Sequence, residues 1–364
     1  MTLAIISDQP TATALLREIS QLCAGHGAQW HHELQVEVAE GGMRLLAPPG
    51  TTGPLISMPT DLLVPIGEAQ WTNSPDALVL VEPPAEATPV QRELLHLHAE
   101  LYNTTGKLHW WRKQHPGRLA ETSSEIAAFL ELLKPGHRAQ AERSAAERFL
   151  ATRSFGWRPN PEQQQRHQVL LPLIDQLNHH HQGAPFRIDD GAMQIKAKQA
   201  GGHECFAHYG HRRDVLDLAL HYGHCDFSTP FAHAAPLEIE VEGIGRVRIE
   251  HQGQRAPVHP SDPPRVTMEL DGLRLSHLCC DQAHPERVQT MLSLALQAQL
   301  KRLGHDAASA LRLAQSGLNA IGEANVRLLD QLVAAAEVSS HPGAPILAAA
   351  AQRQTSIIKS VMRA

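Results

Sequence analysis

The sequence predicts an α+β protein with a helical insert near its middle and a mainly helical C-terminal region. Three observations support this prediction: short alternating or apolar runs between residues 30 and 59, helical spacing of apolar residues from Val90 to Leu150, and an Ala/Leu/Gln-rich stretch of helical periodicity from Pro285 to Ala364. The chain has 364 residues, which is enough for two or three compact lobes.

The N-terminal part reads as one helix followed by short strands. Apolar residues from Thr11 to Cys23 recur at helical spacing, whereas Trp30 to Val38 alternates as a half-buried strand does. Two short apolar runs between Arg44 and Pro59 flank Pro48-Pro49-Gly50, which predicts two strands joined by a turn. A Pro/Ala/Glu linker at 82–89 then leads to the helical block.

The C-terminal part begins with strands and continues with helices. Leu237 to Glu250 alternates on both sides of Gly243-Ile244-Gly245, which predicts two half-buried strands joined at these glycines. A second alternating run covers Arg265 to Leu275. We expect the helices that follow to be broken at Gly304, at Gly317 and at residues 341–343.

Composition disfavours several classes of protein. The net charge of -6 gives no general attraction to nucleic acid, because phosphate binding needs clustered positive charge. No stretch reaches the ~20 apolar residues that cross a bilayer, and the N-terminus lacks the pattern of a secretion signal. We therefore expect a cytoplasmic protein without nucleic-acid or membrane partners. Its five cysteines are scattered and odd in number, so we expect reduced thiols.

Common cofactor signatures are missing, and a metal site is disfavoured. The sequence has no GxGxxG opening a helix, no GxxxxGK[ST] and no GxSxG. A zinc site needs four ligands that converge, and the His/Cys-rich stretch has irregular spacing over what read as different elements. We therefore predict no metal and interpret this stretch as His-rich loops. Its candidate ligands are His203, Cys205, His208, His211, His221, His224 and Cys225.

Three patches between residues 170 and 223 carry the strongest functional signal. The first runs Leu-Leu-Pro-Leu-Ile-Asp-Gln-Leu-Asn-His at 170–179, and taken alone it is equally well a capped turn. The second is Glu-Cys-Phe-Ala-His-Tyr-Gly at 204–210. The third is Asp-Leu-Ala-Leu-His-Tyr-Gly at 217–223.

In combination and in this order, the patches resemble the SET-domain methyltransferases. They are most similar to the branch that contains the Rubisco large-subunit lysine methyltransferase and the actin-histidine methyltransferase. Upstream, Glu-Gly-Gly-Met-Arg-Leu-Leu-Ala at 40–47 and Leu-Ile-Ser-Met-Pro at 55–59 are similar to that branch's opening strand pair. The resemblance covers Val36 to about Cys225, and the helical block at 88–150 matches the branch's insert.

The resemblance implies a SET-domain β-fold in which a C-terminal segment threads through a loop, as in a pseudoknot. The implied domains are 1–87 as the first part of the SET domain with an N-terminal helix, 88–150 as a helical insert, 151–226 as the catalytic part, and 227–364 as a β-then-helical substrate-binding domain. The implied activity is methyl transfer from S-adenosyl-L-methionine to a side-chain nitrogen of a protein substrate.

The resemblance also implies roles for individual residues. Tyr209 is the expected catalytic residue, with its hydroxyl at the mouth of a methyl-transfer tunnel. Two departures from the branch concern the first glycine motif, blurred here to Gly-Gly-Met-Arg, and His224, which stands where the branch prefers Phe. The residues expected to bind the cofactor are Gly41, Gly42, Met43, Arg44, Arg153, Asn178, His179 and Tyr222.

The acceptor pocket is expected to consist of Phe155, Ile174 and Asp175. By the resemblance, lysine-methylating members carry an aromatic residue at the position of Phe155, whereas the histidine-methylating member carries asparagine there and tryptophan at the position of Ile174. We therefore predict a lysine acceptor. Histidine methylation and a binding protein that keeps the SET fold without turnover are the alternatives.

Overall fold

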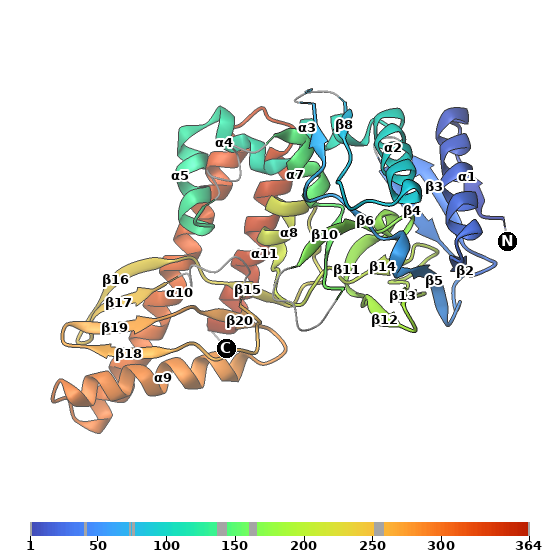
Figure 1. Cartoon of the computed structure of the whole chain (residues 1–364). Coiled ribbons are helices and arrows are strands. Elements are labelled where there is room, and N and C mark those ends of the chain that lie inside the picture. Colours follow the sequence, from blue (N-terminus) through green and yellow to red (C-terminus); the bar gives the residue numbers. More distant parts are fainter. Residues whose placement is uncertain are drawn as a thin grey trace. The chain divides into compact units, whose positions relative to one another are not determined.

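The structure, a computed structural model, describes residues 2–39, 42–72, 74, 77–136, 144–159, 166–250 and 258–362. The chain divides into two compact units, and Figure 1 labels their helices and strands where there is room. The first unit comprises Met1–Lys113 and Arg143–Gly210, and the second comprises Gln114–Glu142 and His211–Ala364. Each unit encloses an apolar core of its own.

The first unit combines small sheets with helices at its N-terminus and in the insert. Its helices are α1 (Pro10–Gly25), α2 (Pro89–Thr104), α3 (Lys107–Gln114, whose last residue belongs to the second unit), α7 (Ala145–Ala151) and the 3-10 turns η1 (Thr60–Leu62) and η3 (Ile174–Gln176). Its strands are β1 (Ala4–Ile6), β2 (Gln29–Trp30), β3 (Gln35–Ala39), β4 (Gly42–Leu46), β5 (Pro54–Pro59), β6 (Val64–Pro65), β7 (Gln70–Trp71), β8 (Leu80–Glu82), β9 (Ser154–Trp157), β10 (His167–Leu170), β11 (Asn178–Ala184), β12 (Arg187–Asp189), β13 (Ala192–Lys196) and β14 (Phe206–Ala207).

Helices α1 and α2 pack together and follow directly from sequence pattern. In α1, Leu15, Leu16, Ile19 and Cys23 form one buried stripe, and a proline begins the helix, as the fixed φ of proline favours. A capping box of Thr88 and Gln91 begins α2. The Gln91 amide also donates to the carbonyls of Asp61 and Leu63, at 2.8 and 3.0 Å, which anchors α2 to the β5–β6 connection.

The second unit contains the remaining helices of the insert and the C-terminal region. Its helices are η2 (Pro116–Arg118), α4 (Leu119–Thr122), α5 (Ser124–Leu133), α8 (Val215–Tyr222), α9 (Pro285–Arg302), α10 (Ala307–Glu337) and α11 (Ala344–Met362). Its strands are β15 (Phe231–His233), β16 (Leu237–Val241), β17 (Gly245–Ile249), β18 (Val266–Glu269), β19 (Gly272–Leu275) and β20 (Cys279–Asp281). Four of these form a sheet in the order β16-β17-β19-β18, and α10 and α9 contact it along β16 and β19 (Figure 1).

The strands of the second unit confirm the predicted hairpin and divide the second alternating run. Strands β16 and β17 pair antiparallel across the glycines at 243 and 245, as expected. The run from Arg265 to Leu275, however, folds as the antiparallel pair β18 and β19. Gly245 is required at its position, because it has φ +88° and an added Cβ would lie 2.3 Å from the Asp271 carbonyl oxygen.

One predicted helix break is wrong. Gly304 ends α9 with φ +92°, but α10 runs unbroken through Gly317. A Cβ at Gly317 would lie 3.0 Å from Ile244 Cδ1 and 3.1 Å from Val241 Cγ1, so the glycine permits close packing of the helix on the sheet. Packing contacts therefore outweigh the low helix propensity of glycine at this position.

The two units also differ from the predicted domains. The insert expected at 88–150 is shared: α2 and most of α3 belong to the first unit, but α4 and α5 belong to the second. The first unit ends at Gly210, so α8 lies in the second unit and not with the region predicted to end at 226. Among the described residues, no helix is both long and apolar enough to span a bilayer.

Candidate active site

Parallel pairing of β11 with β14 brings two of the predicted motifs together in the first unit. Asn178 lies opposite Phe206 and His179 opposite Ala207, so the strand that begins with the Asn-His pair runs beside the segment that leads to Tyr209. The two strands approach closely at Gly183, where an added Cβ would lie 2.5 Å from both carbonyl atoms of Ala207. Only glycine allows this approach without backbone movement.

Tyr209 is held at both ends by the Asn-His segment. Its hydroxyl donates a hydrogen bond to the carbonyl of Leu177, and its backbone N–H donates to Nδ1 of His179 at 3.0 Å. The rings of His179 and Tyr209 lie 5.1 Å apart, and His179 is buried while Tyr209 is half-buried. Because Nδ1 of His179 accepts a hydrogen bond, this nitrogen carries no proton.

The first glycine motif lies beside the same segment. The N–H of Cys205 donates to the Leu45 carbonyl and the N–H of Ala47 to the His203 carbonyl, both at 2.8 Å, which holds β4 next to residues 203–205. Glu204 connects the two motifs, since it accepts a hydrogen bond from Asn178 Nδ2 at 2.7 Å and lies 3.7 Å from the Arg44 guanidinium.

The residues predicted to bind the cofactor within this motif occupy different surroundings. Gly42 begins β4, and an added Cβ there would meet no atom within 4 Å, so this backbone is open to a ligand. Met43 is 3% exposed and belongs to the core, while Arg44 is exposed and hydrogen-bonded to Glu37, a contact that raises the pKa of Arg44. Gly41 lies outside the described residues. The resemblance also implies a turn at residues 41–45, but residues 42–46 form a strand.

Arg153 is a cation without an anionic partner among the residues that the structure describes. It follows α7, and its guanidinium lies 5.6 Å from the centroid of the Phe149 ring. In the part of the chain that the structure describes, the guanidinium makes no hydrogen bond or ion pair, and its Nε is buried without an acceptor. A buried donor that lacks an acceptor is costly, so this group is suited to an anionic ligand.

The predicted acceptor pocket divides between a half-buried ring and two buried residues. Phe155 on β9 lies opposite Val169 of β10, and its ring is 5.4 Å from that of Phe186. Ile174 is 1% exposed in the turn η3. Asp175 in the same turn is 8% exposed, so neither side chain reaches solvent to a large extent.

Sequence reasoning missed the polar groups around Asp175. The Tyr102 hydroxyl, on α2, donates to Asp175 Oδ2, and the Gln176 amide donates to both carboxylate oxygens at 2.6 and 2.7 Å. Lys107 Nζ in turn donates to Gln176 Oε1 at 3.1 Å. The available signal was a tyrosine and a lysine at positions where the apolar pattern of the insert predicts burial. A buried polar group needs a partner, so these residues indicated a polar contact inside the core.

Tyr222 lies outside the first unit, and the His/Cys stretch forms no group with metal-like spacing among the described residues. Tyr222 belongs to the second unit at the end of α8, where the Arg213 guanidinium lies 5.5 Å from its ring centroid. Within the described ranges, the two groups with metal-like spacing are His31, His32 and Glu33, and Asp214, Asp217 and His233. Neither group includes any member of the His/Cys stretch that we considered as zinc ligands.

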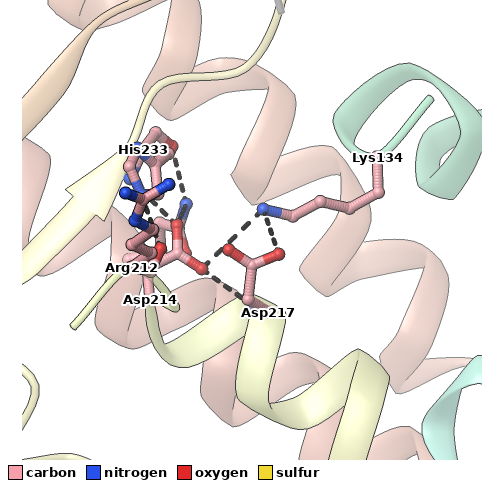
Figure 2. Close-up of polar contacts among 6 residues, drawn as sticks. Lys134, Arg212, Asp214, Asp217 and His233 are labelled. Atoms are coloured by element: carbon pink, nitrogen blue, oxygen red, sulfur yellow. Dashed lines mark hydrogen bonds and ion pairs between the residues drawn. The ribbon is translucent and has the colours of Figure 1, made fainter. Parts of the chain in front are cut away.

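The second of these groups is a buried ion-pair cluster of the second unit. Figure 2 shows the Lys134 ammonium beside two carboxylates, 2.8 Å from Asp217 Oδ1 and 3.8 Å from Asp214 Oδ1. Asp214 begins α8 and also accepts hydrogen bonds from the backbone N–H groups of Asp217 and His233 and from the Gln354 amide, at 2.8 to 2.9 Å. The Lys134 ammonium therefore lies beside the carboxylates where a metal ion would otherwise bind. The cluster joins α5, α8, β15 and α11.

Comparisons with known proteins give a distant structural likeness. No protein-family model and no curated protein sequence matches the chain. The chain is similar to a solved structure of the SET domain of LSMT bound to lysine and AdoHcy, with 12% identity over 97% of this chain and 91% of that one, at a TM-score of 0.41. A structure of the same domain bound to MeLysine and AdoHcy gives 13% identity over 98% and 91%, at a TM-score of 0.43.

Proposed function

We propose that this chain has the SET fold and is a protein methyltransferase that uses S-adenosyl-L-methionine, with Tyr209 as its catalytic residue. The observation that best supports this proposal is the placement of Tyr209. Its hydroxyl donates to Leu177 at the start of the Asn-His segment, and its N–H donates to His179. Three separate motifs of the resemblance thus lie side by side in one unit: β4, residues 177–179 and residues 204–209.

The residues present fit the proposed cofactor. In the described part of the chain the Arg153 guanidinium has no acceptor, which suits the carboxylate of the amino-acid part, and Gly42 leaves its backbone open to a ligand. Asn178 is exposed and turns its amide nitrogen to Glu204, so its carbonyl oxygen is directed away from that contact. When bound, S-adenosylmethionine supplies an electrophilic methyl group on sulfur.

Within this proposal, the protein contributes alignment and exclusion of water. The tyrosine hydroxyl and the Leu177 carbonyl form a polar point at which a methyl group and an attacking nitrogen are oriented. An acceptor lysine has a pKa near ~10.4 in water and must lose its proton before it can attack. An apolar channel favours the neutral amine, because burial disfavours the charged form.

We propose lysine as the acceptor, because Phe155 offers neither a donor nor an acceptor to an imidazole. Its ring packs near Phe186 and is half-buried, so it fits an aliphatic chain with a cationic head before deprotonation. Mass spectrometry of a methylated peptide from the substrate distinguishes the acceptors. A methyl group on histidine would contradict this part of the proposal.

Titration calorimetry with S-adenosylmethionine tests the proposal. We expect Arg153→Ala and Asn178→Ala to weaken binding by roughly 1–3 kcal/mol, since each removes a proposed polar contact with the cofactor. Arg148→Ala is the matched control, because Arg148 lies on α7, just before Arg153, with its guanidinium 5.7 Å from the Trp111 ring centroid. Unchanged affinity in both site variants would end the proposal.

A methyl-release assay on cell lysate separates an enzyme from a binding protein of the same fold. Affinity for S-adenosylmethionine together with transfer of labelled methyl groups to protein supports the enzyme. Affinity without any transfer, for every lysate and substrate fraction offered, would support the binding protein.

A further inference from the structure

The Arg153 guanidinium has no partner among the described residues, although a carboxylate lies in its surroundings. The Phe149 ring centroid lies 5.6 Å from the Arg153 guanidinium and 5.2 Å from the ring of Tyr102, whose hydroxyl donates to Asp175 Oδ2. Arg153 and Asp175 also have opposite effects on the pKa of Tyr102. Two opposite charges in a buried region attract each other strongly. The described residues nevertheless include no ion pair between Arg153 and Asp175.

Asp175 already accepts hydrogen bonds from two other side chains. Its Oδ2 accepts from the Tyr102 hydroxyl, and both oxygens accept from the Gln176 amide. Burial and the Asp175 charge raise the pKa of Tyr102 well above its usual value, so the phenol keeps its proton and remains a donor. The Tyr102 ring is fully buried and packs edge-on to Phe149 at 5.2 Å, which fixes the direction of its hydroxyl.

The other basic side chain nearby, Lys107, donates to Gln176 and not directly to Asp175. Burial, followed by the Arg153 charge, lowers the pKa of Lys107 well below its usual value, which favours a neutral amine. Lys107 donates to Gln176 Oε1 and so orients the amide that faces Asp175. Lys107, Gln176 and Tyr102 thus form one chain of contacts that ends at the carboxylate.

We infer that Tyr102 is a positioning residue that keeps Asp175 from pairing with Arg153, so that the guanidinium stays available to an anionic ligand. This inference rests on the proposed function, in which that ligand is the carboxylate of S-adenosylmethionine. The helical insert then contributes to cofactor affinity through one hydroxyl that does not touch the cofactor.

A double-mutant cycle tests the inference with the full-length protein and calorimetric titration of S-adenosylmethionine. In Tyr102→Phe the carboxylate loses its hydroxyl donor, turns to Arg153 and competes with the ligand. We expect the dissociation constant to rise about tenfold, the factor that corresponds to about 1.4 kcal/mol. Adding Asp175→Asn removes the competing charge, so the double variant should recover the wild-type affinity.

Thr105→Val is the matched control. It removes another buried hydroxyl of the α2 region, one that donates to the Leu101 carbonyl at 2.8 Å and does not contact Asp175. We expect this variant to lose stability and to keep its affinity. Circular dichroism establishes that each variant is folded before it is titrated.

Four outcomes decide the matter. Folded Tyr102→Phe with wild-type affinity, or a double variant as weak as the single one, would overturn the inference and leave the proposed function intact. A crystal structure of Tyr102→Phe in which Asp175 stays away from Arg153 would also overturn it. Wild-type protein without any affinity for the cofactor would overturn both this inference and the proposed function.

Discussion

Lys134→Met removes the cation of the buried cluster in the second unit and is expected to destabilise that unit. Methionine has a similar length and no charge, so the substitution changes the electrostatics more than the packing. Asp217, which is 8% exposed, would lose the ammonium 2.8 Å from its Oδ1, while its Oδ2 is buried without a hydrogen-bond partner in the described structure. Breaking a buried pair from one side costs about 3–5 kcal/mol.

The pKa of Asp217 gives the part of this energy that depends on pH. Burial by itself would raise the pKa, but Lys134, with His233 and Arg213, outweighs burial and lowers the pKa from 3.8 to about 2. A lowered folded-state pKa means that the contribution to stability is present above pH 3.8 and is lost as pH falls through about 2. The difference corresponds to about 2 kcal/mol.

Urea unfolding at a series of pH values, from neutral down to about 2, measures both quantities. Without Lys134 the pKa of Asp217 is governed by burial and rises, so acid protonates the carboxylate. The difference between variant and wild type should therefore be largest near neutral pH and smaller in acid. Lys359→Met is the control, because Lys359 makes no ion pair in the part of the chain described. A loss under about 1 kcal/mol, typical of a surface pair, would refute the reasoning.

Two further predictions concern the candidate active site. Tyr209→Phe should leave cofactor affinity nearly intact and depress methyl transfer, because only a hydroxyl at the reacting centre is lost. A proportional loss of calorimetric affinity and turnover would instead show that the hydroxyl is structural. Gly183→Ala should separate β11 from β14, since its Cβ would lie 2.5 Å from the Ala207 carbonyl, and so lower both thermal stability and cofactor affinity. Wild-type melting and affinity in that variant would contradict the close approach of the two strands.

The sequence singled out the segments of the candidate site but not the strand pairing that joins them. Tyr209 and Asn178 were proposed from motifs, and the structure pairs the strands that lead to them or begin with them. Periodicity could not predict the parallel pair that joins them, because β11 reads Asn-His-His-His-Gln-Gly-Ala and shows no alternation of apolar and polar residues. The role of Gly183 likewise depends on the neighbouring strand and has no local signal.

The helices of the insert show a second limit of sequence reasoning. Their apolar faces were predicted, but an amphipathic pattern indicates only that one face of a helix is buried. It does not indicate against which core that face packs. Leu94 and Tyr102 on α2 face the core of the first unit, whereas Ile126 and Leu130 on α5 face that of the second. The Tyr102–Asp175 contact was missed for the same reason, since it joins residues 73 positions apart.

The first unit is assembled from two stretches of chain that the ribosome makes at different times. Strand β5 pairs with β13, and the helices α4 and α5 are synthesised between them. These helices emerge before His211–Ala364, which provides the rest of their core. During translation their apolar faces therefore stay exposed to solvent until the rest of the core is synthesised. Exposed apolar surface favours chaperone binding and aggregation. The nascent chain is most prone to aggregation in this interval. A truncation that removes His211–Ala364 would leave the apolar faces of α4 and α5 permanently exposed.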